Sequence, residues 1–254
     1  MRFFRKNNKI VRFLRLTKAF FRHPIKTVWI NYKCLPVKQA WRLPIFVYTK
    51  TIFRSVSGKI LIDSDVISTG MIRIGVDGWY PATAMPQTIW SINGLLKFTG
   101  PISFPQGTYI MVAENAKLQF GSKGTFIGAN TKIMCFESIT IGDNAQITWD
   151  CQLYDTSFHY IDVGGKVMGL TSPISVGNNV WIGNNTTITK GAVIPDWTII
   201  GNYSLVNKNL SENGEHCFYA GMPAILKKKN VTRIFDAEIE NNYDNQFGYN
   251  RNHL

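Results

Sequence analysis

One histidine stands at a position where a regular pattern of aliphatic residues breaks. Ile141, Ile147 and Leu153 recur at six-residue intervals and predict another aliphatic at position 159, but that residue is His159. Imidazole is the side chain whose charge changes near physiological pH, so its neutral form can accept a proton from a hydroxyl or an amine. His159 is therefore the candidate general base.

Groups near this histidine could complete the chemistry. A general base of this kind needs a partner on its other ring nitrogen to fix the tautomer. Asp155 is the first candidate, Asp162 and a backbone carbonyl are alternatives, and Asp155 could equally serve a turn. A backbone N–H in a turn is the simplest donor to an oxyanion, and Gly183 is one candidate.

The histidines and cysteines show no metal-binding pattern. The chain has four histidines, at His23, His159, His216 and His253. It has four cysteines with no CxxC pair, at Cys34, Cys135, Cys151 and Cys217. We therefore expect no bound metal, and we expect the thiols to be reduced and mostly buried, as in a cytosolic protein.

A six-residue repeat runs through the middle of the chain. It is strict after the histidine, at Val176, Ile182, Ile188, Ile194, Ile200 and Val206, and looser upstream, at Ile127, Ile133 and Ile139. A period of six fits short strands and tight turns rather than a helix, and Gly and Asn suit such turns. Three hexads make one triangular coil of about 18 residues, and stacked coils bury one aliphatic column. The alternative, an antiparallel β-sandwich, does not hold so strict a spacing.

Composition and the break in the repeat divide the chain. Residues 159–175 are expected to form a loop extruded from the β-helix, with Gly164 and Gly165 at its tip, and such loops often carry function. The predicted regions are a basic aromatic arm at 1–55, a β-helix at 56–228, and a polar tail at 229–254 with a short amphipathic stretch and a frayed end.

Two segments resemble the hexapeptide-repeat acyltransferases. They are PISVGNNVWIG, from Pro173 to Gly183, and AGMPA, from Ala220 to Ala224. Their order after a histidine-bearing loop is similar to that of sugar O-acetyltransferases. The resemblance covers residues 100–228 well and 60–100 poorly. It implies a left-handed parallel β-helix, acetyl-CoA as cosubstrate, His159 as base, and a homotrimer with an acyl-CoA groove between subunits.

The resemblance also assigns residues to that groove. Trp181 matches the family tryptophan that lines it, although a packed aromatic at a trimer interface is the other interpretation. Positions matching a region associated with CoA contacts are Ser204, Asn207 and Lys208. Lys208 would neutralise a phosphate, and the lysines from Lys227 to Lys229 would meet the 3′-phosphate end, unless they form an ordinary solvated face. Tyr203 departs from the family pattern, and its side chain would narrow the groove.

The basic excess belongs to the N-terminal arm. The net charge is +12, yet residues 1–60 hold fifteen of the 28 Lys and Arg and no acid, which leaves 13 basic against 16 acidic residues in the remainder. On a helical wheel the apolar side holds Phe3, Phe4, Ile10, Val11 and Leu14. The basic side holds Arg2, Arg5, Lys6, Lys9 and Arg12. We therefore expect residues 1–22 to bind an anionic membrane surface. The apolar side argues against a nucleic-acid arm.

These observations predict a function and a location. No signal peptide or spanning segment is recognisable in the sequence, so we expect a cytoplasmic protein on the inner face of a bacterial membrane. The predicted activity is acetyl-CoA-dependent O-acetylation of a sugar hydroxyl, on a glycan that can be lipid-linked, in surface or capsular polysaccharide synthesis. Two alternatives stay open: an N-acetyltransferase of an amino sugar-nucleotide, and a non-catalytic β-helix scaffold.

Overall fold

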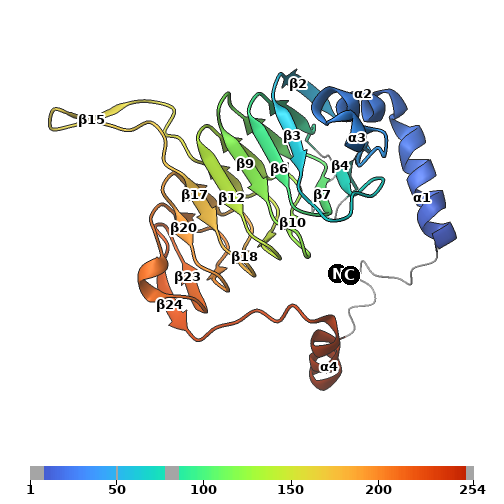
Figure 1. Cartoon of the computed structure of the whole chain (residues 1–254). Helices are drawn as coiled ribbons and strands as arrows, with labels where there is room; N and C mark the ends of the chain where they lie inside the picture. The colour runs from blue at the N-terminus through green and yellow to red at the C-terminus, as the bar shows by residue number, and fades with distance from the viewer. Residues whose placement is uncertain (1–8, 50, 78–85, 250–254) are drawn as a thin grey trace.

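Three walls of parallel strands form a left-handed β-helix in the computed structural model, which describes residues 9–49, 51–77 and 86–249 (Figure 1). The first wall contains β2 (Ile52–Val56), β5 (Ile89–Ile92), β8 (Tyr109–Val112), β11 (Lys132–Cys135), β14 (Gln152–Tyr154), β19 (Thr187–Thr189) and β22 (Leu205–Val206). The second contains β3 (Lys59–Ile62), β6 (Leu95–Phe98), β9 (Lys117–Phe120), β12 (Ser138–Ile141), β17 (Ile174–Val176) and β20 (Val193–Ile194).

The third wall is made of two sheets that meet at β7 and β10. The first sheet holds β1 (Ile45–Val47), β4 (Ile72–Val76) and β7 (Ile102–Pro105). The second holds β10 (Phe126–Ile127), β13 (Gln146–Ile147), β18 (Trp181–Ile182), β21 (Ile199–Ile200), β23 (Cys217–Ala220) and β24 (Ile225–Lys229). Every strand pair in the three walls is parallel except β23 with β24, which closes the C-terminal end.

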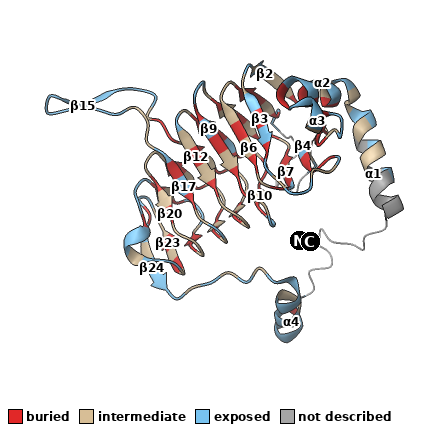
Figure 2. Ribbon diagram, viewed as in Figure 1, coloured by how far each residue is buried: buried red, intermediate tan, exposed pale blue. Residues whose placement is uncertain are grey.

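The six-residue repeat is the core of the β-helix, as expected. Every aliphatic that defined the repeat is at most 1% exposed (Figure 2). The register stacks these residues from coil to coil; Leu153, for example, pairs with Ile133 above and with Ile188 below. β12 carries two inward side chains, Ile139 and Ile141, which explains why the spacing shifts there.

The upstream coils are filled by aromatic rather than aliphatic side chains. Trp90, Phe98, Phe104 and Phe120 are fully buried, with ring centroids 4.9 Å apart for Trp90–Phe104 and 5.7 Å apart for Phe98–Phe120. The coils therefore continue through the described residues 60–77 and 86–100. The family resemblance is poor there because larger rings replace the aliphatic hexad residues. The first coil begins at Ile45, so the expected boundary at residue 55 falls inside β2.

Three helices cover the N-terminal end of the β-helix: α1 (Lys9–Arg22), α2 (Pro24–Cys34) and α3 (Val37–Ala40) (Figure 1). α1 includes part of the expected basic amphipathic helix, but Arg2, Phe3, Phe4, Arg5 and Lys6 lie outside the described residues. None of the helices in the described part of the chain is both long and apolar enough to cross a membrane.

The C-terminal tail is more ordered than its composition suggests. After β24 it runs without regular structure to Asp236, and α4 (Ala237–Phe247) follows. The Asp236 carboxylate accepts hydrogen bonds from the N–H groups of Glu238 (2.8 Å) and Ile239 (3.0 Å), as an N-cap residue does. The expected amphipathic stretch at residues 231–239 is therefore helical only at its end, and residues 250–254 lie outside the described part.

Candidate active site

The expected loop at residues 159–175 is an antiparallel hairpin that projects from the corner between the first and second walls. Its strands are β15 (Ile161–Val163) and β16 (Lys166–Met168), inserted between β14 and β17 (Figure 1). Gly164 and Gly165, with φ of 61° and 84°, make the turn at the tip, and the Asp162 carboxylate accepts the Gly165 N–H at 2.7 Å. The insertion leaves the stacking of the coils unchanged.

A tight turn places His159 at the base of this hairpin. The Thr156 hydroxyl accepts the Phe158 N–H at 3.0 Å, and the Ser157 hydroxyl donates to the His159 carbonyl at 3.0 Å. Phe158 has φ of 59°, a left-handed conformation that is unfavourable for a bulky residue and is often found at functional sites. Its ring packs edge-on against Phe136 at 5.5 Å. The imidazole of His159 is consequently held at the surface.

Lys190 ties the hairpin base to the next coil. Its ammonium group lies 2.6 Å from the Gly169 carbonyl oxygen, 3.5 Å from the Leu170 carbonyl oxygen and 3.2 Å from the Ser157 hydroxyl. The segments that enter and leave the hairpin are thus joined by one cation. Sequence reasoning missed this residue, because a lysine in a turn after a hexad strand has the pattern of an ordinary solvated side chain.

Asp155, the expected partner of His159, is fully buried and bonded elsewhere. Its carboxylate accepts three backbone N–H groups, from Phe136 at 2.7 Å, Glu137 at 2.9 Å and Ser138 at 2.8 Å. These groups lie at the preceding corner, so the carboxylate holds that turn in place. Within the described chain, neither ring nitrogen of His159 has a hydrogen-bond partner. The expected Asp155–His159 pair is therefore not formed.

The buried thiols are poor nucleophiles. Burial raises the pKa of Cys34 and of Cys151 to about 11. Burial, assisted by the nearby Asp155 carboxylate, also raises the pKa of Cys135. All four cysteines are buried and unpaired. Because the thiolate is the reactive form, these residues do not favour a mechanism through an acylated cysteine.

Trp181, expected to line a groove between coils, is half-buried and contacts the C-terminal tail. The Arg233 guanidinium carbon lies 5.1 Å from the Trp181 ring centroid and 4.7 Å from that of Phe235. Arg233 also donates to the side-chain oxygen of Gln146 at 2.9 Å, and Gln146 is the strand neighbour of Trp181. Burial lowers the pKa of Arg233, and the Glu240 carboxylate opposes that shift. Nothing in the tail sequence indicated this contact.

The tail makes a second set of contacts at Trp197. The Trp197 ring stacks on His216, with centroids 5.5 Å apart, and meets Phe235 at 6.1 Å. The His216 Nδ1 atom lies 2.8 Å from the Thr232 hydroxyl. His216 and Trp197 therefore hold the tail against the last coils.

Gly183 and Ser204 serve the coil stack rather than an open site. The Gly183 N–H donates to the Ile200 carbonyl at 2.9 Å, so the expected oxyanion donor is already engaged in the ladder between coils. A side chain there would collide with Asn202, which explains the glycine. The buried Ser204 hydroxyl donates to the Gly201 carbonyl at 2.7 Å and accepts the Gly221 N–H at 3.2 Å.

The remaining candidates lie on the last coils and are exposed. Asn207 and Lys208 follow β22, and Lys227 lies on β24. Tyr203, which precedes β22, is 64% exposed and has φ of 54°. His159 therefore stands at the corner between the first two walls, whereas Trp181 and Lys227 belong to the third. One chain does not gather all the expected residues into one pocket.

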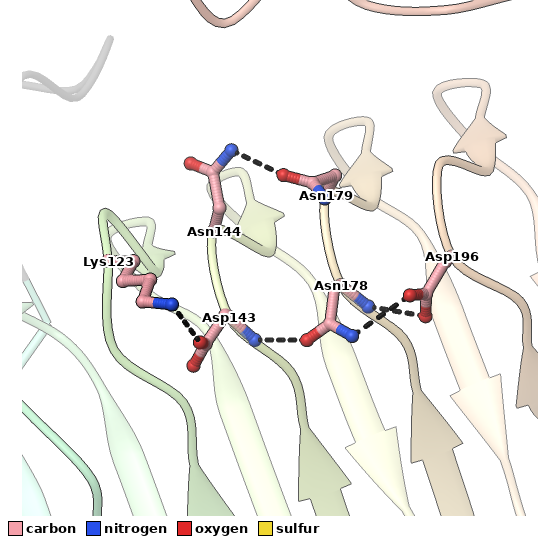
Figure 3. Close-up of a pocket in the computed structure, with 6 residues that line it drawn as sticks. All are labelled: Lys123, Asp143, Asn144, Asn178, Asn179 and Asp196. Carbon is pink, nitrogen blue, oxygen red and sulfur yellow. Dashed lines mark hydrogen bonds and ion pairs between the residues drawn. The ribbon is translucent and has the colours of Figure 1, made fainter.

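A polar hollow occupies a different corner, between the second and third walls (Figure 3). Its lining residues are Lys123, Asp143, Asn144, Asn178, Asn179 and Asp196. Asn144 donates to Asn179 at 2.8 Å and Asn178 donates to Asp196 at 2.9 Å, which links successive coils. Asn144 and Asn179 have φ of 54° and 55°, a conformation that asparagine tolerates. These side chains build a ladder that supports the turns.

Known proteins share this repeat and fold. A Klebsiella pneumoniae protein described as an uncharacterized 24.8 kDa protein in the cps region is 28% identical over 140 residues, 55% of this chain and 61% of that protein. The galactoside O-acetyltransferase of Escherichia coli K12 is 32% identical over 116 residues, 44% of this chain and 52% of that enzyme. The chain thus spans little more than half the length of the curated relatives it matches.

A solved structure extends the likeness over more of the chain. The polySia-specific acetyltransferase NeuO superposes with a TM-score of 0.53 over 79% of this chain and 94% of that one, at 20% identity. At that identity the likeness concerns the fold alone. No protein-family model matches the chain.

Proposed function

We propose that this chain is a hexapeptide-repeat acetyltransferase and that it transfers an acetyl group from acetyl-CoA to a sugar hydroxyl of a surface polysaccharide. The observation that carries the proposal is the position of His159, exposed at the base of a hairpin on a rigid scaffold. Two relatives support the substrate class: one is a galactoside O-acetyltransferase, and the other is described by its place in a cps region.

The reaction we propose is direct transfer in a ternary complex. His159 accepts the proton of the sugar hydroxyl while its oxygen attacks the thioester carbonyl. When the tetrahedral intermediate collapses, the C–S bond breaks, and the imidazolium returns the proton to the departing sulfur of CoA. The products are an acetyl ester and CoA with a free thiol. The raised thiol pKa values of Cys34 and Cys151 support a route without a cysteine intermediate.

A homotrimer would complete the site. The hairpin exposes apolar side chains that nothing covers in the described chain: Tyr160, Ile161, Val163, Val167 and Met168. Such a patch is typical of an interaction surface. We propose that the hairpin of one subunit lies against the third wall of its neighbour, so that His159 approaches Trp181 of that neighbour. Asn207, Lys208 and Lys227 are the proposed contacts to CoA, the two lysines to its phosphates.

We also propose a location for the enzyme. Residues 1–22 would hold it on an anionic membrane surface on the cytoplasmic side, where lipid-linked glycans are assembled. The absence of any acid before Asp63 supports this location, since each basic residue near an anionic leaflet contributes about 1 kcal/mol.

The test is incubation of the purified chain with acetyl-CoA and oligosaccharide acceptors, followed by mass spectrometry. We expect one acetyl group per modified site, removed by mild base as an ester is. A base-stable acetyl group would identify an N-acetyltransferase. Failure to bind acetyl-CoA would leave a non-catalytic scaffold and overturn the proposal.

A further inference from the structure

α2 has one face buried against the fold and a second, apolar face that is largely exposed. The buried face consists of Thr27, Ile30, Asn31 and Cys34. The opposite face repeats the same helical spacing with Ile25 (84% exposed), Val28 (39%), Trp29 (43%) and Tyr32 (52%). Residues at i, i+3, i+4 and i+7 share one side of a helix. This second face is therefore an apolar and aromatic stripe that is largely open to solvent, although Trp29 also packs on Phe53 of β2, with ring centroids 5.5 Å apart.

Hydrogen bonds to β1 fix the direction in which the stripe points. β1 is the first strand of its sheet, so its outer edge would otherwise be unpaired. The Asn31 side chain donates to the Ile45 carbonyl at 2.7 Å and accepts the Ile45 N–H at 3.0 Å, while the Thr27 hydroxyl accepts the Val47 N–H at 3.2 Å. α2 thus closes the end of the coil stack, and most of its opposite face, with Ile25 and Tyr32, points away from the coils.

Neighbouring helices enlarge this face. Phe21 is 71% exposed at the end of α1, and Val37 (71%) and Trp41 (62%) are exposed in and just after α3 (Figure 2). We call these residues, with the α2 stripe, the end surface. Exposed cations surround it: Lys18, Arg22, Lys33, Lys38 and Arg42. Arg22 pairs at 3.4 Å with exposed Asp77, and Arg42 lies over the Trp41 ring.

We propose that the end surface docks on an anionic lipid bilayer, with the β-helix standing away from the membrane. Tryptophan and tyrosine beside Lys and Arg are the side chains that favour the interface between headgroups and acyl chains. The acid-free sequence before Asp63 complements anionic headgroups. The inference rests on the proposed membrane location. It extends the membrane-binding part of the chain from residues 1–22 to the end surface.

End-on docking limits which sugar the enzyme can reach. In the first wall β14, which leads into the hairpin, is four strand spacings from β2. Neighbouring strands lie about 4.8 Å apart, so His159 would stand at least about 19 Å above the first coil. The acceptor hydroxyl would therefore belong to a sugar remote from the lipid anchor rather than to the first one attached to it.

Vesicle co-sedimentation of the full chain tests the docking. The informative variant is Ile25→Ser/Val28→Ser/Tyr32→Ser, which leaves the contact between Trp29 and Phe53 in place. Its matched control is Ile239→Ser/Tyr243→Ser/Phe247→Ser, which removes three exposed apolar residues from α4. We expect the wild type and the control to bind phosphatidylglycerol-containing vesicles at least tenfold more tightly than the α2 variant. Pure phosphatidylcholine vesicles should bind all three weakly.

Three results would overturn the proposal. They are equal binding of the α2 variant and the wild type, no preference of the wild type for the anionic vesicles, and no vesicle binding at all. The last would favour an acidic protein partner for the end surface. Acetyl transfer to a short soluble acceptor should be unchanged in the α2 variant. A loss of vesicle binding with full activity thus separates this inference from the proposed chemistry.

Discussion

Lys190 and Ser157 meet at 3.2 Å across the base of the hairpin, although they are 33 residues apart in sequence. The same Ser157 hydroxyl donates to the backbone carbonyl of His159. The cation therefore acts on the proposed base through one intermediate group, without a contact to the imidazole. This arrangement makes Lys190 a positioning residue and leads to the first prediction.

Lys190→Ala should lower kcat by roughly 10- to 100-fold, because a displacement of about 1 Å in a catalytic group can cost that much. KM for acetyl-CoA should change little, since Lys190 bonds only to the hairpin. Lys190→Arg should recover part of the loss. Lys166→Ala, on the exposed strand β16, is the control. Steady-state kinetics that gave Lys190→Ala and Lys166→Ala equal kcat values would contradict the assignment.

His159→Ala should lower turnover by roughly 10²- to 10⁴-fold, the usual contribution of a general base. Its exposed position should leave the fold and CoA binding intact, which calorimetric titration with CoA can check. If the variant kept more than about a third of the wild-type rate, another group would have to accept the proton.

Ile188→Asp should prevent folding. The side chain is fully buried in the column between Leu153 and Val206, where a carboxylate would have no partner. Thr187→Asp places the same charge on the outward side of the same strand and should be tolerated. Expression yield and circular dichroism distinguish the two. A folded Ile188→Asp protein would mean that the inward register of β19 is misassigned.

Arg233→Ala should loosen the tail at Trp181, while the contacts of Trp197 and His216 keep it on the last coils. The contact with Trp181 is expected to contribute about 1 kcal/mol to the free energy of unfolding. A double-mutant cycle with Trp181→Ala isolates this contribution from the other losses. Strict additivity of the two substitutions in thermal unfolding would show that the rings and the guanidinium do not interact.

Alkaline pH should destabilise the fold through buried thiols. The pKa of Cys34 and of Cys151 rises from 9.0 to about 11 on burial. A raised pKa in the folded state means that the unfolded chain loses its thiol protons first. Stability should therefore fall as pH rises from about 9 toward 11. Thermal midpoints at pH 7 and 10 should differ less in Cys34→Ala/Cys151→Ala, and an unchanged difference would place the effect elsewhere.

The hexad pattern alone predicted the core column, the β-helix and the position of the extruded segment. This worked because the repeat is local: each coil places its aliphatic inward by the same short turn geometry, whatever lies above it. His159 was found for the same reason, as the one residue that breaks the frame before the hairpin. The two motif segments added the resemblance to a family and the expectation of acetyl-CoA as cosubstrate.

Contacts between coils were decided by the tertiary structure. Asp155 could bond to a histidine four residues away or to backbone groups at the preceding corner, and stacking placed it against Phe136, Glu137 and Ser138. The amide of Gly183 was likewise taken by the next coil. α2 was not predicted from the sequence, and its bonds to the edge of β1 separate the face that closes the β-helix from the face left largely to solvent. In each case the hydrogen-bond partner depends on which backbone group, distant in sequence, lacks one. The local periodicity of the sequence does not reveal that.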